Sequence, residues 1–166
     1  MLKQFELAGT TLIQEDVELI GEWAMKSRIL EELELQNNNM VPRFMEILMD
    51  YMKENKRLVQ LNISYNNMIE GFSGNNMARV LETEARVMQQ LVTFLRSNKK
   101  LIHLDLSATN LGEGAILHIL PAIKKARSLQ GIHLSGNPGV TDFIKSEARK
   151  LLKTNPLEVR KILNLT

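Results

Sequence analysis

The sequence has 166 residues, of which 44% are hydrophobic and 24% are charged, and its formal net charge is +2. This balance is typical of a globular domain and argues against a disordered or collagen-like chain. Because the chain has no cysteine and no apolar run near the roughly 18 residues of a membrane span, we expect a cytoplasmic protein without membrane contact, with the nucleus or the cytoskeleton as alternative locations.

Taken in chain order, the sequence repeats one pattern, L-x-x-L-x-L-x-x-N-x-L. Its six copies begin at Leu2, Leu30, Leu58, Leu101, Leu129 and Leu157. Successive starts are 28 residues apart, except that 43 residues separate the third start from the fourth. The third repeat therefore carries an insertion of about 15 residues near 69–83. The sixth copy is truncated and has Arg160 at its second apolar position, so we expect about five repeats and a truncated sixth.

Each repeat is predicted to form a short strand followed by a helix. Residues 32–36, ELELQ, alternate between apolar and polar as a strand does, whereas Met45, Leu48 and Met52 have the spacing of one helix face. In the insertion, the apolar residues from Met77 onward are expected to extend the following helix by one or two turns. Since one unit cannot bury its apolar side alone, the units are expected to stack into a curved α/β solenoid, with a parallel sheet on the concave face and the helices on the convex face.

The ninth position of the pattern is asparagine in three copies, Asn38, Asn66 and Asn137, and threonine in two, Thr10 and Thr109. An asparagine amide both donates and accepts hydrogen bonds, so it can satisfy backbone groups in the tight turn that leaves the strand. A threonine hydroxyl can do part of the same. We therefore assign these residues to the turns and not to a binding site.

On these residues and this spacing, the sequence resembles leucine-rich-repeat proteins of the 28-residue, ribonuclease-inhibitor-like class. The resemblance covers essentially all of residues 1–166, which we interpret as a single leucine-rich-repeat domain. That class includes ribonuclease inhibitor, tropomodulin, the Ran GTPase-activating protein and the recognition domains of NOD-like receptors. Neither end of the repeat array has a polar cap, so the chain is expected to be part of a longer protein or to associate through its ends.

The side chains that point away from the core along the predicted strands are the candidate partner-binding residues. They include Glu6, Glu32, Glu34, Gln36, Gln60, Asn62, His103, Asp105 and His133. Residues 1–50 contain ten acidic and four basic side chains, a net charge of −6, so the face is acidic toward the N-terminus. One interpretation is that it binds a basic segment of another protein; the other is a polar surface that only keeps the sheet soluble.

One group on this face has residue types suited to chemistry. Asp105 and His133 are expected on neighbouring strands, with His103 beside Asp105 and two serines, Ser107 and Ser135, nearby. Two imidazoles and a carboxylate can hold a metal ion or act as acid and base. An open, hydrated sheet offers no pocket and no oxyanion donors, however, so we expect no enzyme activity, no cofactor and no metal.

The sequence therefore predicts a non-enzymatic protein–protein interaction module, a scaffold or adaptor, with a polar and partly acidic concave sheet as its binding surface. The resemblance implies two alternatives: a regulator of a small GTPase, similar to the Ran GTPase-activating protein, or an actin-linked role similar to that of tropomodulin. Nucleic-acid binding is not expected, because the lysines and arginines are scattered over helices without interleaved aromatic residues.

Overall fold

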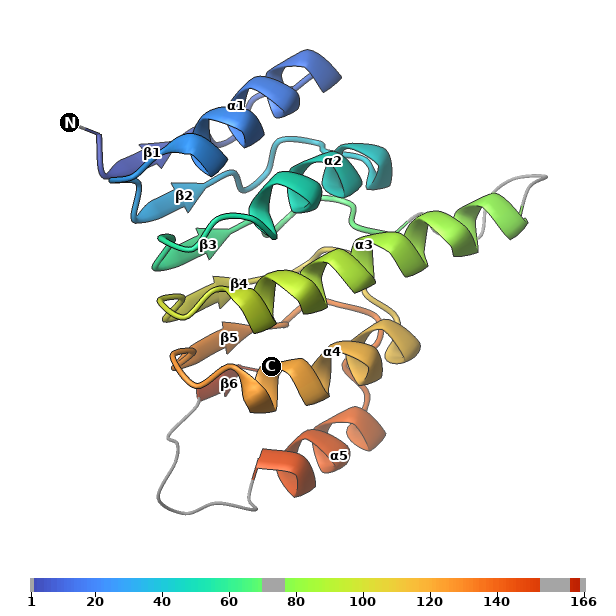
Figure 1. Ribbon diagram of the computed structural model, residues 1–166. Helices are drawn as coiled ribbons and strands as arrows, with labels where there is room; N and C mark the ends of the chain where they lie inside the picture. Colours follow the sequence, from blue (N-terminus) through green and yellow to red (C-terminus); the bar gives the residue numbers. More distant parts are fainter. Residues whose placement is uncertain (1, 70–76, 153–161, 165–166) are drawn as a thin grey trace.

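The structure is a computed structural model that describes residues 2–69, 77–152 and 162–164 (Figure 1). In these ranges, six strands and five helices alternate along the chain: β1 (Gln4–Glu6), α1 (Gln14–Lys26), β2 (Glu32–Glu34), α2 (Pro42–Met52), β3 (Gln60–Asn62), α3 (Met77–Ser97), β4 (His103–Asp105), α4 (Glu113–Lys125), β5 (Gly131–His133), α5 (Asp142–Leu152) and β6 (Ile162–Asn164). The strands form one sheet in the order β1 to β6. The helices lie side by side along one side of this sheet (Figure 1).

The sheet is parallel throughout, and its register follows the sequence repeat. Gln4 pairs with Glu32, Glu32 with Gln60, Gln60 with His103, and His103 with Gly131. All of these residues stand at the third position of their repeat, counted from the first leucine. The pairing register of the first five strands therefore follows the spacing of the sequence pattern.

The predicted start of the sixth repeat was wrong by three residues. A start at Leu157 would place Val159 opposite Gly131, but the residue that pairs with Gly131 is Ile162. The residue at the next position is then Leu163, which pairs with Ile132, whereas the predicted register would have paired Ile132 with Arg160. Leu157 and Arg160 themselves lie outside the described residues.

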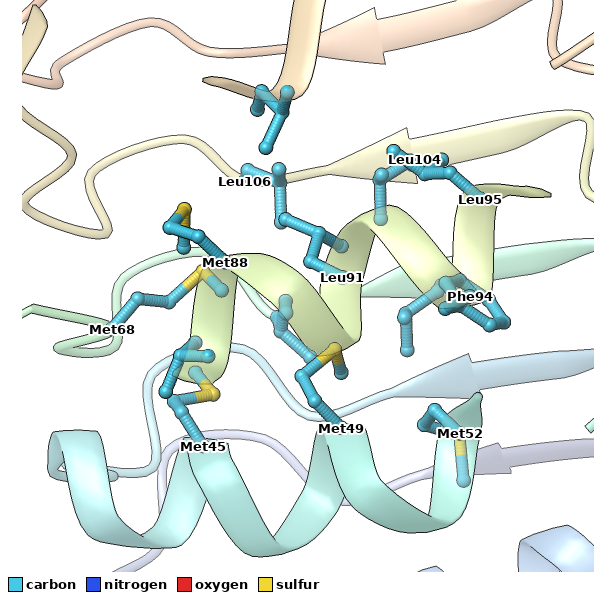
Figure 2. Close-up of a cluster of buried hydrophobic side chains, with 14 of the residues drawn as sticks. Met45, Met49, Met52, Met68, Met88, Leu91, Phe94, Leu95, Leu104 and Leu106 are labelled. Carbon is cyan, nitrogen blue, oxygen red and sulfur yellow. The ribbon is translucent and has the colours of Figure 1, made fainter. Parts of the chain in front are cut away.

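The core lies between the sheet and the helices. The leucines and isoleucines at the fourth and sixth positions of the central repeats are all buried: Leu33, Leu35, Leu61, Ile63, Leu104, Leu106, Ile132 and Leu134. Between β3, α2 and α3 they meet a methionine-rich cluster that includes Met45, Met49, Met52, Met68 and Met88 (Figure 2). Unbranched methionines fill irregular gaps well, so this cluster can join α2 to the longer α3. The prediction that these residues face inward is confirmed.

Helix α3 is longer than its neighbours, as the insertion led us to expect. It spans 21 residues, against 11 in α2 and 13 in α4. Its additional length lies at the N-terminal end and amounts to about two turns, which project beyond α2 and α4 (Figure 1). The rest of the insertion, residues 70–76, lies outside the described residues. Within the described ranges, neither α3 nor any shorter helix is apolar enough over a sufficient length to span a membrane.

The ninth-position asparagines form a ladder in the turns after the strands. The Oδ1 of Asn66 accepts hydrogen bonds from the backbone N–H groups of Asn38 and Met40, at 3.0 and 3.1 Å, in the preceding repeat. Its Nδ2 donates to the Leu35 and Ile63 carbonyl oxygens. The predicted structural role of this position is confirmed.

A second polar ladder, at the other end of the strands, was not predicted. Three residues before the next repeat begins stand Ser27, Asn55 and Asn98. The Oδ1 of Asn55 accepts from the Leu58 N–H at 2.8 Å, while its Nδ2 donates to the Ala24 carbonyl at 2.7 Å. The signal was present in the sequence as a column of Ser, Asn and Asn, each three residues before the start of the next repeat, which the leucine pattern did not include.

Candidate protein-binding surface

The face of the sheet without helices, here called the open face, carries the candidate binding residues. It is made of the third- and fifth-position side chains of the first five strands: Gln4, Glu6, Glu32, Glu34, Gln60, Asn62, His103, Asp105 and His133. On β2 to β5 these side chains are half-buried, because each is flanked by its neighbours on adjacent strands. On β1, at the edge of the sheet, Gln4 and Glu6 are exposed.

Glu34 is fixed in place by two amides from the next strand. Its Oε1 accepts a hydrogen bond from Gln60 Nε2 at 2.5 Å, and its Oε2 accepts one from Asn62 Nδ2 at 3.0 Å. Asn62 is held in turn, because its Oδ1 accepts from both the hydroxyl and the N–H of Ser64. Glu34, Gln60 and Asn62 therefore form a rigid polar cluster, and Glu34 is less available to a partner than its exposed position in the sequence pattern suggested.

Glu6 and Glu32 differ from Glu34 in this respect. Within the part of the chain that the structure describes, neither carboxylate takes part in a hydrogen bond or ion pair. Glu32 lies beside Gln4 and Gln60 in the sheet, while Glu6 lies beside Glu34. The N-terminal part of the open face thus has two carboxylates without a partner in the described ranges, next to a third that is already bound.

His103 and His133 are brought together by a glycine. The two rings stack with centroids 4.8 Å apart and an angle of 11° between their planes. His103 pairs along the sheet with Gly131, and a Cβ atom at Gly131 would lie 3.3 Å from His103 Cε1. The missing side chain at Gly131 therefore gives the His103 ring the space to reach His133.

The neighbouring serines and Asp105 form hydrogen bonds with one another. Ser107 Oγ lies 3.0 Å from Ser135 Oγ, and Asp105 Oδ1 accepts the Ser107 N–H at 2.8 Å. As the sequence predicted, Asp105 and His133 lie opposite one another on the adjacent strands β4 and β5. Among the described residues, no group of three or more histidine, aspartate or glutamate side chains is arranged to hold a metal ion.

The turn residue three positions after the end of each of the first five strands forms a second row beside the open face. This eighth position has a positive φ in all five repeats: Gly9, 69°; Asn37, 56°; Tyr65, 55°; Ala108, 50°; Gly136, 70°. Just before it, Gln36 lies half-buried with an Oε1 that has no hydrogen-bond partner in the described part of the chain. The sequence reasoning missed Tyr65, which is 65% exposed, because it considered only the strand positions.

Two of the hollows formed by the described residues lie on the helix side of the molecule. One, of about 520 Å³, lies between α3 and α4 and is lined by Glu84, Met88, Ala115 and His118 among others. Partial burial in it raises the pKa of the Glu84 carboxyl above its usual range. The other, of about 380 Å³, is lined by α1, α2 and α3. Glu46, which lines this hollow, forms ion pairs with Arg43 and Arg86, with nitrogen–oxygen distances of 3.0 and 3.1 Å.

Comparison with known proteins identifies the fold through solved structures. Neither a protein-family model nor a curated protein matches the chain. The tropomodulin C-terminal domain from Caenorhabditis elegans superposes with a TM-score of 0.66 at 16% sequence identity, over 92% of this chain and 83% of that one. Actin-binding site 2 of leiomodin-1 superposes with a TM-score of 0.66 at 14% identity, over 90% of this chain and 78% of that one. These likenesses establish a leucine-rich-repeat-like α/β fold.

Proposed function

We propose that this protein is a non-enzymatic protein–protein interaction module that binds its partner through the open face. The observation that carries the proposal is the contrast on that face between Glu34, which is held by Gln60 and Asn62, and Glu6 and Glu32, which have no partner in the described ranges. The carboxylates of Glu6 and Glu32, beside the rigid cluster around Glu34, are therefore suited to binding a partner. We further propose that its repeats are of the ribonuclease-inhibitor-like class and that it acts as a scaffold or adaptor.

The partner segment is proposed to be basic. Residues 1–50 carry the net charge of −6, and β1 and β2, which hold Glu6 and Glu32, lie in this part of the chain. An acidic surface speeds the encounter with a basic segment and fixes its register, and the effect weakens with added salt. We therefore expect the association rate to fall more steeply with ionic strength than the dissociation rate rises.

The test compares two double variants with the same change in charge. Glu6→Lys with Glu32→Lys reverses the charge on the open face, whereas Glu15→Lys with Glu54→Lys does so at exposed positions outside it. Glu34 is left unchanged because it also holds Gln60 and Asn62. In affinity purification from cell extract, we expect the first variant to lose specific partners that the second retains. Equal recovery by both variants, with unchanged circular dichroism spectra, would show that the open face is not the binding surface.

Actin is the first partner to test, and an actin-linked role is the second candidate function. Its support is the structural likeness to actin-binding site 2 of leiomodin-1 over 90% of the chain, which would also fit association with the cytoskeleton. The same two double variants serve in co-sedimentation with actin filaments and in measurements of filament elongation. Binding or altered elongation that depends on Glu6 and Glu32 would support this candidate, and unaltered elongation without co-sedimentation would remove it.

A further inference from the structure

Tyr65 occupies a backbone conformation that tyrosine normally avoids. Four other residues share its position in the repeat, and two of these are the glycines Gly9 and Gly136, while a third is Asn37. Glycine has no Cβ to clash in the left-handed region, and asparagine tolerates it. A bulky aromatic residue at a φ of 55° is an outlier that the rest of the fold must hold in place. The fold requires a left-handed residue at this position, but it does not require an aromatic one.

The Tyr65 ring makes few of the interactions that stabilise the folded state. Its side chain is 65% exposed, and within the described residues it forms no hydrogen bond or ring contact. Only the backbone is used, since the Tyr65 N–H donates to the Ser107 carbonyl at 2.9 Å. Strained residues that do not stabilise their own fold are found mostly at functional sites. The exposed Tyr65 ring is therefore a candidate contact for a partner.

The neighbours of Tyr65 in its row have small side chains. The Asn37 N–H donates to the Ser64 carbonyl, as the Tyr65 N–H does to Ser107, so Asn37, Tyr65 and Ala108 lie in one row at the strand spacing of about 4.8 Å. Side chains in this row lie close to one another, because a Cβ at Gly136 would be 3.4 Å from Ala108 Cβ. Tyr65 thus stands between a short amide and a methyl group, as the largest side chain of the row.

We propose that Tyr65 is the anchor with which this protein holds a basic segment of its partner. A lysine or arginine of that segment stacks on the Tyr65 ring through a cation–π contact, while other cations of the segment meet Glu32 on β2, the strand next to β3, and Glu6 on β1 beyond it. Tyrosine is one of the residues that most often dominate the binding energy of protein interfaces. The side chains of the row carry no charge. The preference for a cationic occupant comes from the carboxylates in the N-terminal part of the open face. This inference rests on the proposed function and names the chemistry of its partner.

A defined peptide tests the proposal without the natural partner. The probe is a 12-residue peptide of alternating arginine and alanine with blocked ends, and the matched controls replace every arginine by glutamine or by glutamate. Titration into the isotopically labelled chain, followed by NMR, is expected to give saturable shifts of the Tyr65, Asn37 and Glu32 amide signals with the arginine peptide only. Shifts confined to acidic residues of α1, or equal effects of the glutamine peptide, would overturn the proposal.

Variants of the row separate anchoring from folding. Tyr65→Asn installs the residue that already stands at this position as Asn37, so we expect it to raise the Tm by about 2–4 °C. The same variant is expected to weaken binding of the arginine peptide about five- to thirtyfold. Tyr65→Phe keeps the ring and should bind nearly as well as the original chain. Ala108→Gly relieves strain in the neighbouring repeat and should leave peptide affinity unchanged.

The outcomes distinguish this inference from the proposed function. If Tyr65→Asn binds the peptide with full affinity while Glu6→Lys with Glu32→Lys does not, the anchor is refuted and the open face stands. A lower Tm of Tyr65→Asn would also refute it, because the ring would then serve the fold. If the peptide binds through Tyr65 but no partner from extract depends on Glu6 and Glu32, the proposed function fails and the cation site remains.

Discussion

The Oδ1 of Asn66 accepts a hydrogen bond from the backbone N–H of Asn38, which is 28 residues earlier in the chain, at 3.0 Å. The same oxygen accepts the Met40 N–H, and the Asn66 amide donates to the Leu35 carbonyl. The turn of one repeat is thus completed by a side chain of the next. Neighbouring repeats are joined by this ladder as well as by the sheet and the core, so damage to one asparagine affects two repeats.

Replacing Asn66 by alanine should be strongly destabilising. Asn66 is 5% exposed, and its removal leaves the Asn38 and Met40 N–H groups and the Leu35 carbonyl without their partners. Because a buried polar group left unsatisfied costs about 1–3 kcal/mol, we expect a loss of about 3 kcal/mol or more in the free energy of unfolding. Urea unfolding followed by circular dichroism measures it.

Thr10→Ala is the matched control at the exposed end of the same ladder. Thr10 is exposed, and its hydroxyl makes a single hydrogen bond, to Asn38 Oδ1 at 3.0 Å. Water can replace that bond, so the change should alter stability by about 0.5 kcal/mol or less. Similar losses for Thr10→Ala and Asn66→Ala would contradict the account of the ladder.

The two glutamates of β2 should respond differently to removal. Glu34→Ala leaves the half-buried amides of Gln60 and Asn62 without their acceptor, and we expect it to lower the free energy of unfolding by about 1–2 kcal/mol. Glu32→Ala removes a carboxylate that has no partner in the described ranges, and its effect should stay within about 0.5 kcal/mol. Chemical unfolding of both variants at one pH compares them directly, and equal stabilities would show that the Glu34 cluster does not form in solution.

Two helical glycines should give opposite results when replaced by alanine. A Cβ at Gly21 in α1 would overlap the ring of Tyr51 in α2, with Tyr51 Cγ at 3.0 Å, whereas a Cβ at Gly114 in α4 would have no atom within 4 Å. Overpacking costs about 1–3 kcal/mol, so Gly21→Ala should lower the Tm. Gly114→Ala should raise stability by about 0.5 kcal/mol through helix propensity. A Tm of Gly21→Ala equal to that of the unchanged chain would mean that α1 and α2 do not pack this closely.

The repeat register was predictable because it is set by the spacing of residues that must face the core. Leucines at intervals of 28 residues, or 43 across the insertion, predicted the places of β1 to β5. The same 28-residue interval led to Leu157 as the sixth start, whereas the strand pairs Leu163 with Ile132. Leucine spacing alone does not show which register the sixth strand adopts. The fourth position of a repeat has to be apolar, and Arg160 at that position argued against a start at Leu157.

The candidate site was predictable only as a set of positions. Alternation along a strand identified the side chains of the open face, but it does not report which of them bind one another. Glu32 and Glu34 are equivalent by pattern, and they differ because Asn62 and Gln60 reach Glu34. Tyr65 is unusual because its backbone φ is 55°. Gly9, Asn37 and Gly136 stand at the same position of their repeats, and these residue types could have indicated a left-handed conformation there.

The partial burial of Glu84 predicts a pH-dependent change in stability. Burial raises the pKa of its carboxyl in the folded chain, so as pH rises the unfolded chain releases this proton first and the folded state loses stability. The penalty is absent well below the ordinary glutamate pKa and complete above the raised pKa. Glu84→Gln should therefore raise the Tm at about pH 7, by only about 1 °C because the group is largely solvated, and should have a smaller effect near pH 4. Thermal scans at both values check this against Glu54→Gln at an exposed position, and a gain for Glu84→Gln that is larger at the lower pH would reverse the assigned sign.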